Sequence, residues 1–376
     1  RLGAAMIRGL QAAGVAATVK HFPGLGAVDR DTHHELAVVR GDREMLDDTE
    51  LVPFRAAIAA GAKVAMSAHV AVPALSGDPT LPATLSRAVM TDTLRNDLGF
   101  TGISISDALD MRALAQGAAQ AVEVIAAIRA GDDLLLTTAD RTARRRIEST
   151  LLAAAGRHLF EPADLDASRA RLADLRRWLG GATPQPDLDV VGSAEHVALS
   201  RELAERALTR TDRAPDGGEP APIALSPSTR ILAIMPEPAD LTPADTSSLV
   251  EPGLARALRT RFGSVEEVVV PGSPSDDEIA GLRTRAMSFD AVVVGTIEAH
   301  RRPAQAALVR AIVASDVTTI AVALRTPWDA ATYPPGVAAV CTYSILPHPL
   351  DALARALAGE IGFPGRLPVA VALPHR

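Results

Sequence analysis

Side chains that can hold, donate or accept protons gather in one short stretch, TVKHFPGLGAVDRDTHHELAVV, at residues 18–39. This stretch contains three of the nine histidines of the chain. An apolar run leads to Lys20 and His21, and proline and glycine follow, which predicts a strand end entering a tight turn. Asp31 stands two residues before His33, so its carboxylate can reach the imidazole, fix its tautomer and raise its basicity. The pattern is typical of a general acid/base pair in an active-site loop, and a polar loop that is merely rich in histidine is the alternative.

A second candidate lies in the stretch SISDALDM, at residues 104–111, where Asp107 follows a short apolar run. A carboxylate in this place can attack an electrophilic carbon, since carboxylates form covalent glycosyl intermediates in retaining glycosidases. The alternative is that Asp107 caps the next helix, and Asp110 is interpreted in that structural way. The sequence therefore offers an acid/base pair and a nucleophile that are far apart in the chain.

Several other polar side chains are weaker candidates. His34 directly follows another histidine and no H-x₃-H spacing is present, so we expect no metal site and no cofactor. Lys20 can in principle form a Schiff base, and His69 either lines a pocket or is a buried structural histidine. Ser67 and Ser106 lack a G-x-S-x-G context, which disfavours a serine hydrolase.

The elements that must position these residues alternate between short apolar strands and longer helices, as in a parallel sheet. A glycine that can end a helix precedes each predicted strand. Polar residues follow the strands, and in parallel sheets such residues gather at one edge. Four strand–helix units are half of a (β/α)₈ barrel. The expected strands are residues 16–20, 62–69, 102–106 and 132–136, and the expected helices are residues 2–13, 50–60, 86–98 and 118–130.

A second α/β pattern follows a linker. Residues 148–180 predict two helices, residues 180–187 a linker, and residues 193–208 a further helix. Apolar strands then recur with helical segments between them, which predicts a compact parallel or mixed sheet. They are residues 230–234, 265–270, 291–295, 319–324 and 337–343. We therefore expect a half-barrel over residues 1–182, a linker and connecting helix over residues 183–228, and an α/β domain over residues 229–376.

The bulk composition limits the classes of function. A chain of 376 residues is long enough for two domains. Its net charge of −7 gives no footprint for nucleic acid, and no run of about 18 apolar residues spans a membrane. Cys341 is the single cysteine, so no intrachain disulfide is possible, which fits either a reducing compartment or an exported protein. The sequence does not indicate an oligomeric state.

Together these motifs resemble glycoside hydrolase family 3, in its β-N-acetylhexosaminidase branch. KHFPGLG-AVDR-DTH is similar to the K-H-F-P-G-H-G-x₄-D-[ST]-H signature of that family. The resemblance continues in AMSAHVAVPAL, PATLSRAVMTDTLRNDLGFTGISISDALDM and AGDDLLL, and it runs on to PHPLDALARALAGEIGFPGRLPV. It covers essentially the whole chain in an ordered series of motifs.

The resemblance implies a retaining, exo-acting β-N-acetylglucosaminidase that takes a carbohydrate substrate. Asp107 falls on the nucleophile of the family and His33 on its acid/base, while Asp31 falls on the carboxylate that orients that histidine. Lys20 and His21 fall on residues that hold the sugar hydroxyl groups, and His69 is a candidate for lining the sugar pocket. The implied fold is a barrel followed by a smaller α/β sandwich domain.

Three other functions remain open. A β-glucosidase or β-xylosidase of the same family would take its acid/base from the second domain, where Glu298 is a candidate by position only. A neutral imidazole at His33 repels an anionic acceptor less than a carboxylate would, so a β-N-acetylglucosaminide phosphorylase is a further alternative. The third is a non-catalytic sugar-binding homologue. With aromatic residues at only 3%, we expect a small pocket for a terminal sugar of short glycans or cell-wall saccharides.

The chain departs from the family pattern in three ways. Leu25 stands where many relatives have histidine, and Ala37 replaces a frequent proline, which is expected to loosen the far end of the loop. The resemblance also begins at the fourth helix of the barrel. We therefore expect a fragment that is inactive and poorly soluble by itself, because half a barrel exposes sheet edges and apolar interior.

Overall fold

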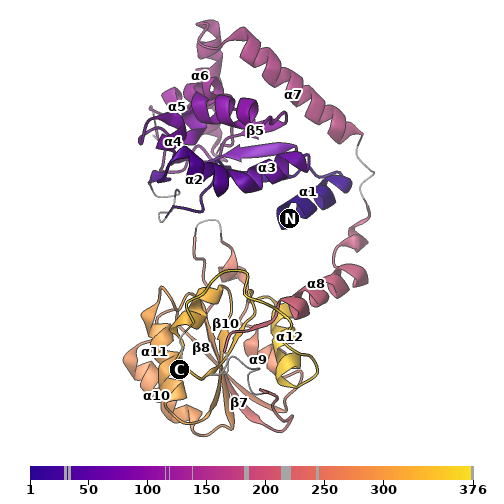
Figure 1. Ribbon diagram of the computed structural model, residues 1–376, viewed down its shortest axis with the longest axis vertical. Helices are drawn as coiled ribbons and strands as arrows, with labels where there is room; N and C mark the ends of the chain where they lie inside the picture. Colours follow the sequence, from indigo (N-terminus) through magenta and orange to yellow (C-terminus); the bar gives the residue numbers. More distant parts are fainter. Residues whose placement is uncertain are drawn as a thin grey trace. The chain divides into compact units, whose positions relative to one another are not determined.

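The computed structural model of the protein describes residues 1–28, 32, 35–114, 116–117, 119–137, 139–181, 186–212, 222–242 and 245–373. The chain is an α/β protein that divides into two compact units, Arg1–Gln185 and Pro186–Arg376 (Figure 1). None of the described helices has the length and apolar character that a membrane crossing requires.

The first unit is built on a parallel sheet with the strand order β1-β3-β5. Its strands are β1 (Thr18–Phe22), β3 (Val64–Ser67) and β5 (Ile103–Ile105). The strand expected at residues 16–20 begins later than predicted, so Lys20 and His21 lie within β1. The strand expected at residues 132–136 forms only one parallel bridge, from Leu134 to Ile105.

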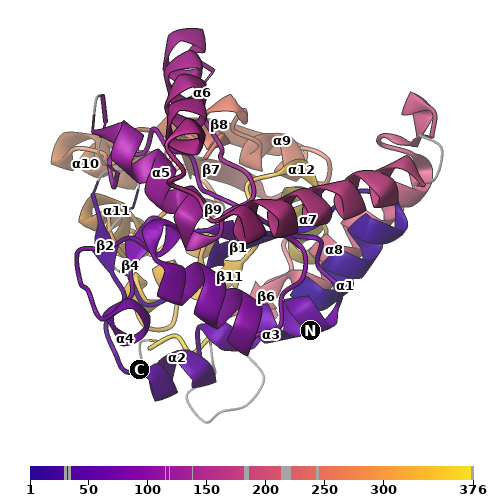
Figure 2. The same ribbon diagram turned by 90° about the horizontal axis from the view of Figure 1, so that it is seen from above.

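Helices surround this sheet, and each of the four that were expected is present. The long helix α7 follows α6 (Figure 2), and it contacts β5. Phe22 and Phe54 pack edge to face in the main apolar cluster of this unit, with ring centroids 5.1 Å apart. The helices are α1 (Leu2–Ala12), α2 (Arg43–Asp48), α3 (Leu51–Ala59), α4 (Pro73–Ser76), the 3₁₀ turn η1 (Ala83–Leu85), the π-helix η2 (Ala88–Asp97), α5 (Gln120–Ala130), α6 (Arg141–Gly156) and α7 (Pro162–Gly180).

A buried carboxylate ties α7 and η2 to the sheet. Both Asp133 oxygens accept from Arg171 of α7, and Oδ2 also accepts from Arg95 of η2 at 2.9 Å. The backbone N–H of Ser104 in β5 donates to the same Oδ2 at 3.0 Å. Because the Asp133 side chain is completely buried, these bonds replace the water that the charge has lost.

The second unit holds a six-stranded sheet with the order β6-β11-β10-β9-β7-β8. Five strands are parallel, as expected, and β6 runs antiparallel to β11, so the sheet is mixed. The strands are β6 (Thr209–Arg210), β7 (Arg230–Pro236), β8 (Ser264–Val270), β9 (Ala291–Thr296), β10 (Thr318–Ala323) and β11 (Ala338–Cys341).

Alternate residues along these strands point into two different apolar clusters. Ile231 and Ala233 of β7 pack in one cluster with residues of α9 and α12, whereas Leu232 and Ile234 pack in the other with residues of α10 and α11. A strand with apolar side chains on both faces is the pattern of a sheet covered by helices on both sides. The helices are α8 (Ala194–Ala207), α9 (Leu254–Leu258), α10 (Asp276–Ala286), α11 (Pro303–Val313) and α12 (Pro347–Leu357), with 3₁₀ turns η3 (Leu188–Val190), η4 (Ser247–Leu249) and η5 (Pro327–Thr332).

The segment expected as a linker, residues 183–228, contributes to this second unit. Helix α8 packs against α12, and β6 extends the sheet beside β11. The connecting helix is therefore part of the α/β unit in the structure.

Candidate active site

Strand β1 contains two of the expected site residues, Lys20 and His21. The peptide bonds Lys20–His21 and Phe22–Pro23 are both cis. The turn that follows contains Gly24 at φ 135°, where a Cβ would lie 2.9 Å from the Cβ of Glu50. Glycine is therefore required there both for its backbone conformation and for the close approach of Glu50.

The structure brings His21 and Asp107 together across two strand ends. His21 Nε2 lies 3.6 Å from Asp107 Oδ2, and the two side chains are 27% and 16% exposed. Asp107 Oδ1 accepts from the backbone N–H of Ala108 at 2.8 Å. The next helix, α5, begins only at Gln120, so Asp107 does not cap a helix. A partly exposed carboxylate with one oxygen held by a backbone N–H and the other beside an imidazole is placed where it can contact a bound electrophile.

His69 lies beneath this pair with its ring enclosed. It is fully buried, its Nδ1 is 2.8 Å from Thr84 Oγ1, and its Nε2 is 3.1 Å from the carbonyl oxygen of Ala108. Burial lowers the pKa of His69 below its ordinary value, although the Ala108 carbonyl and Asp107 oppose this shift. His69 is thus a neutral, fully partnered ring next to the backbone that carries Asp107.

The acid/base pair expected at Asp31 and His33 lies outside the described residues, as does His34. Thr32 between them is buried. Lys20, expected to hold a sugar hydroxyl, has an exposed side chain on β1.

Both ends of the predicted loop are fixed. Leu25 packs against the main apolar cluster. Beyond the loop, β2 (Ala37–Val38) pairs in parallel with β4 (Val70–Ala71), directly after His69. The expectation that Ala37 loosens the far end is wrong, because Ala37 is buried and paired in this ladder.

Sequence reasoning missed two members of the polar group under the site. Thr84 of η1 and Asp132 are both buried, and each contacts the hydroxyl of Ser67, at 3.0 and 3.3 Å respectively. Ser106 is also structural, since its Oγ accepts from the backbone N–H of Leu136 at 3.0 Å. The available signal was the first aspartate of AGDDLLL, a charged residue at the start of an otherwise apolar run.

A second histidine–aspartate pair lies in the second unit. His300 Nδ1 is 2.8 Å from Asp329 Oδ1, and Thr296 donates to Asp329 Oδ2 at 2.7 Å. Asp329 is fully buried, and burial together with this carboxylate raises the pKa of Tyr333 well above its ordinary value. Glu298, named above as a rival acid/base, lies near Arg301 and Arg302 at 3.8 and 3.9 Å.

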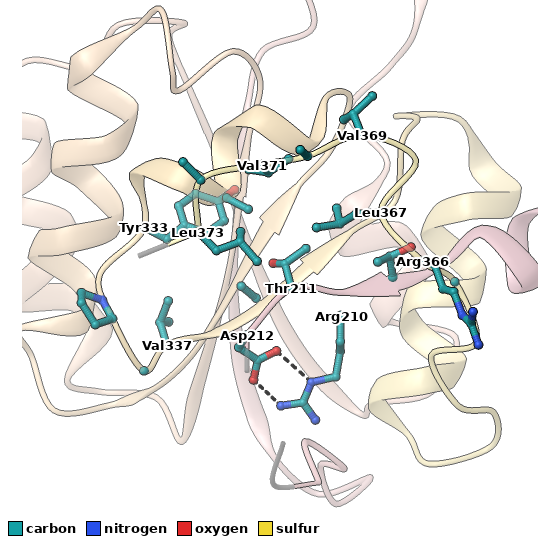
Figure 3. Close-up of a pocket in the computed structure, with 18 of the residues that line it drawn as sticks. Arg210, Thr211, Asp212, Tyr333, Val337, Arg366, Leu367, Val369, Val371 and Leu373 are labelled. Atoms are coloured by element: carbon teal, nitrogen blue, oxygen red, sulfur yellow. Dashed lines mark hydrogen bonds and ion pairs between the residues drawn. The ribbon is translucent and has the colours of Figure 1, made fainter. Parts of the chain in front are cut away.

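The second unit also contains a cavity of about 670 Å³ (Figure 3). It is lined by β6 and the residues after it, by the segment around Tyr333 and by the C-terminal segment from Arg366 to Leu373. Arg210 and Asp212 form an ion pair on its wall. Of the expected active-site residues that the structure describes, which are Lys20, His21, His69 and Asp107, none lines this cavity. Among the residues that the structure describes, no three histidine, cysteine or acidic side chains converge to hold a metal ion.

Comparisons with known proteins point to one family. Residues 1–175 match the family described as Glycosyl hydrolase family 3 N terminal domain. A beta-hexosaminidase of Stenotrophomonas maltophilia is 42% identical over 133 residues, which are 35% of this chain and 39% of that protein. A protein of Cellulomonas fimi named Beta-N-acetylglucosaminidase/beta-glucosidase is 32% identical over 229 residues, which are 57% of this chain and 40% of that protein. The matches thus span about 40% of the length of these curated relatives.

A solved structure matches both units. It is a glycoside hydrolase family 3 beta-N-acetylglucosaminidase from Paenibacillus sp. str. FPU-7, with a TM-score of 0.88 and 32% sequence identity. The match covers 99% of this chain and 70% of that one.

Proposed function

Because this chain belongs to glycoside hydrolase family 3, we propose that it carries the catalytic groups of a retaining, exo-acting β-N-acetylglucosaminidase. The observation that supports this most directly is the position of Asp107, whose carboxylate lies 3.6 Å from His21 of the KHFPGLG motif. Two residues that the family resemblance assigns to one sugar site are neighbours, although they are far apart in the sequence.

In the proposed mechanism Asp107 attacks the anomeric carbon of a terminal N-acetylglucosamine. His33, oriented by Asp31, protonates the leaving oxygen and then removes a proton from the water that releases the sugar. An imidazole suits both steps, because its ordinary pKa of about 6.5 lets it donate and accept protons near neutral pH. Lys20 and His21 are assigned to the sugar hydroxyls.

The proposal includes a fold for each unit. The first would be the C-terminal half of a (β/α)₈ barrel, with Asp107 and His21 at the carboxyl ends of its strands, where barrel enzymes place their chemistry. The second would be the smaller α/β sandwich domain of the family.

The substrate class is proposed from the names of the relatives and from composition. Terminal N-acetylglucosamine of short glycans or cell-wall saccharides is favoured, because aromatic residues that line long polysaccharide clefts are scarce, at 3%. The name of the Cellulomonas fimi relative favours β-glucosidase activity as the second candidate.

The test is the kinetics of the full-length protein on aryl N-acetylglucosaminides and aryl glucosides. Asp107→Asn should lower kcat by at least about 10³-fold, because the covalent step is lost. His33→Ala should reduce kcat/KM far more for a poor leaving group than for an activated one, which needs little protonation. Faster turnover of glucosides would favour the β-glucosidase, and full activity of Asp107→Asn would reject the assigned nucleophile.

A further inference from the structure

Four buried polar side chains connect the interior of the first unit to the backbone beside Asp107. The hydroxyl of Ser67 lies 3.3 Å from Asp132 Oδ2 and 3.0 Å from Thr84 Oγ1. Thr84 Oγ1 lies 2.8 Å from His69 Nδ1, and His69 Nε2 lies 3.1 Å from the Ala108 carbonyl. Ser67, His69 and Thr84 are completely buried and Asp132 is 3% exposed, so each group depends on its neighbours for hydrogen bonds.

The direction of these hydrogen bonds follows from the Ala108 carbonyl, which can only accept. His69 Nε2 must therefore carry a proton and donate it. Since burial keeps the ring neutral, Nδ1 is bare and accepts from the hydroxyl of Thr84. Thr84 Oγ1 is then free to accept from Ser67. In the alternative, Thr84 donates to the Ala68 carbonyl at 3.0 Å, and His69 Nδ1 must then donate to Thr84. The Nε2 atom of the neutral ring would carry no proton, and two acceptors, Nε2 and the Ala108 carbonyl oxygen, would face each other.

The same logic reaches Asp132. If Ser67 donates to Thr84, its oxygen can only accept from Asp132, which must then carry a proton. Burial raises the pKa of Asp132 well above its ordinary value and outweighs the hydrogen bond with Ser67, which lowers it; Asp133 adds to the rise and Arg95 opposes it. Asp132 Oδ1 has no hydrogen-bond partner among the described residues, which also fits an uncharged acid rather than a buried anion.

At its other end, this series of hydrogen bonds reaches the proposed nucleophile through the backbone of Ala108. The carbonyl of Ala108 accepts from His69, and the N–H of the same residue donates to Asp107 Oδ1 at 2.8 Å. Among the residues that the structure describes, the titratable groups that act on His69 are His21 and Asp107. A shift of the Ala108 backbone would therefore move the carboxylate relative to His21.

We propose that Asp132, Ser67, Thr84 and His69 form a one-directional chain of hydrogen bonds that holds the Ala108 backbone and thereby positions Asp107 for attack. The inference rests on the proposed function for its catalytic consequence. All four are positioning residues, since they act through Ala108 and not on the sugar. Of the two roles that the sequence leaves open for His69, lining the sugar pocket or a structural role, the proposal assigns the structural one.

The test compares two Thr→Val substitutions in the full-length protein. Thr84→Val removes the central hydroxyl without changing the side-chain size, whereas Thr93→Val removes a similarly buried hydroxyl that donates only to the Ala88 carbonyl at 2.9 Å. Thr84→Val should lower kcat by about tenfold or more with little change in KM, because reacting atoms lose alignment. The loss should be equal for good and poor leaving groups, Thr93→Val should keep kcat, and Thr84→Ser should restore it.

A second readout does not depend on turnover. Hydrogen exchange at the amides of Ala108 and Leu109 should be faster in Thr84→Val than in Thr93→Val, and Ser67→Ala should have the same effect if Thr84→Val does not fold. Equal kcat and equal exchange in the two valine variants would overturn the inference. Faster exchange in a protein that hydrolyses neither aryl glycoside would reject the proposed function while supporting the positioning contact.

Discussion

Asp107 lies near two histidines that the structure places in different surroundings. The His21 side chain is 27% exposed and faces the carboxylate, whereas His69 is completely buried and holds the adjacent backbone. The sequence identified both residues at strand ends, but it left open whether His69 is a pocket residue or a structural one. The ring of His69 is enclosed by contacts with Thr84 and with the Ala108 carbonyl, which are 15 and 39 positions away in the sequence, so local sequence does not determine its burial.

The polar group under the site was only partly predictable for the same reason. The sequence disfavours Ser67 as a nucleophile, and Thr84 lies in the motif PATLSRAV without any signal of its role. The hydroxyl of Ser67 contacts Thr84 and Asp132, which are 17 and 65 positions away in the sequence. The motifs therefore predicted which residue types gather near Asp107, but not which hydrogen bonds connect them.

A buried neutral acid at Asp132 makes stability depend on pH. Its folded-state pKa is raised well above 3.8, so the folded state holds the proton more tightly than the unfolded state. The stabilising contribution is complete below the unfolded pKa and is lost as pH rises through the folded one. Asp132→Asn should therefore gain stability relative to the wild type at alkaline pH, by about 1.4 kcal/mol for each unit of the pKa difference.

Thermal unfolding of both proteins at about pH 4 and about pH 8 measures this gain. Asp290→Asn is the control, because the exposed Asp290 pairs with Arg230 and its pKa is lowered by that hydrogen bond. Because the pKa of Asp290 is lowered, the wild-type residue loses its stabilising contribution as the pH falls, which is the opposite direction to Asp132. A difference between Asp132→Asn and wild type that is the same at both pH values would contradict a raised pKa.

At the scale of elements, the long periodic segments were predicted and the short paired ones were not. The parallel strands of the second sheet and the helices of the first unit occur close to their expected residues. The strands β2, β4 and β6 have two residues each, too few for an alternating pattern to be visible. Their pairing arises from tertiary contacts, so the sequence pattern predicts neither the pairing of Ala37 in β2 nor the strand at residues 209–210.

The carboxylate of Asp133 carries the attachment of α7 and η2 to β5. Asp133→Asn should destabilise the protein by about 3–5 kcal/mol, because two partly buried arginines lose their shared counter-charge. Asp290→Asn provides the matched control, since it breaks an ion pair whose side chains are about half exposed and should therefore lower the free energy of unfolding far less. Urea unfolding of the two variants compares the free energies directly. Similar losses in both would show that the Asp133 cluster contributes no more than a surface ion pair.

At the scale of the whole molecule, the chain contains separate apolar cores. Each hydrophobic cluster draws its residues from one unit, with two clusters on the faces of the six-stranded sheet and the others around the three-stranded sheet. The composition predicted two domains, because a chain of 376 residues exceeds the size of most single cores. All the residues proposed for catalysis belong to the first unit, whereas the six-stranded sheet belongs to the second.

Separate cores predict separable unfolding. Leu94 of η2 and Leu232 of β7 are both completely buried, one in each unit. Leu94→Ala and Leu232→Ala should each cost about 2–5 kcal/mol through lost packing and the remaining cavity. In differential scanning calorimetry we expect two transitions, with each substitution lowering the midpoint of a different one. A single transition that both substitutions lower equally would mean that the two units unfold as one cooperative body, because each core would then depend on the integrity of the other.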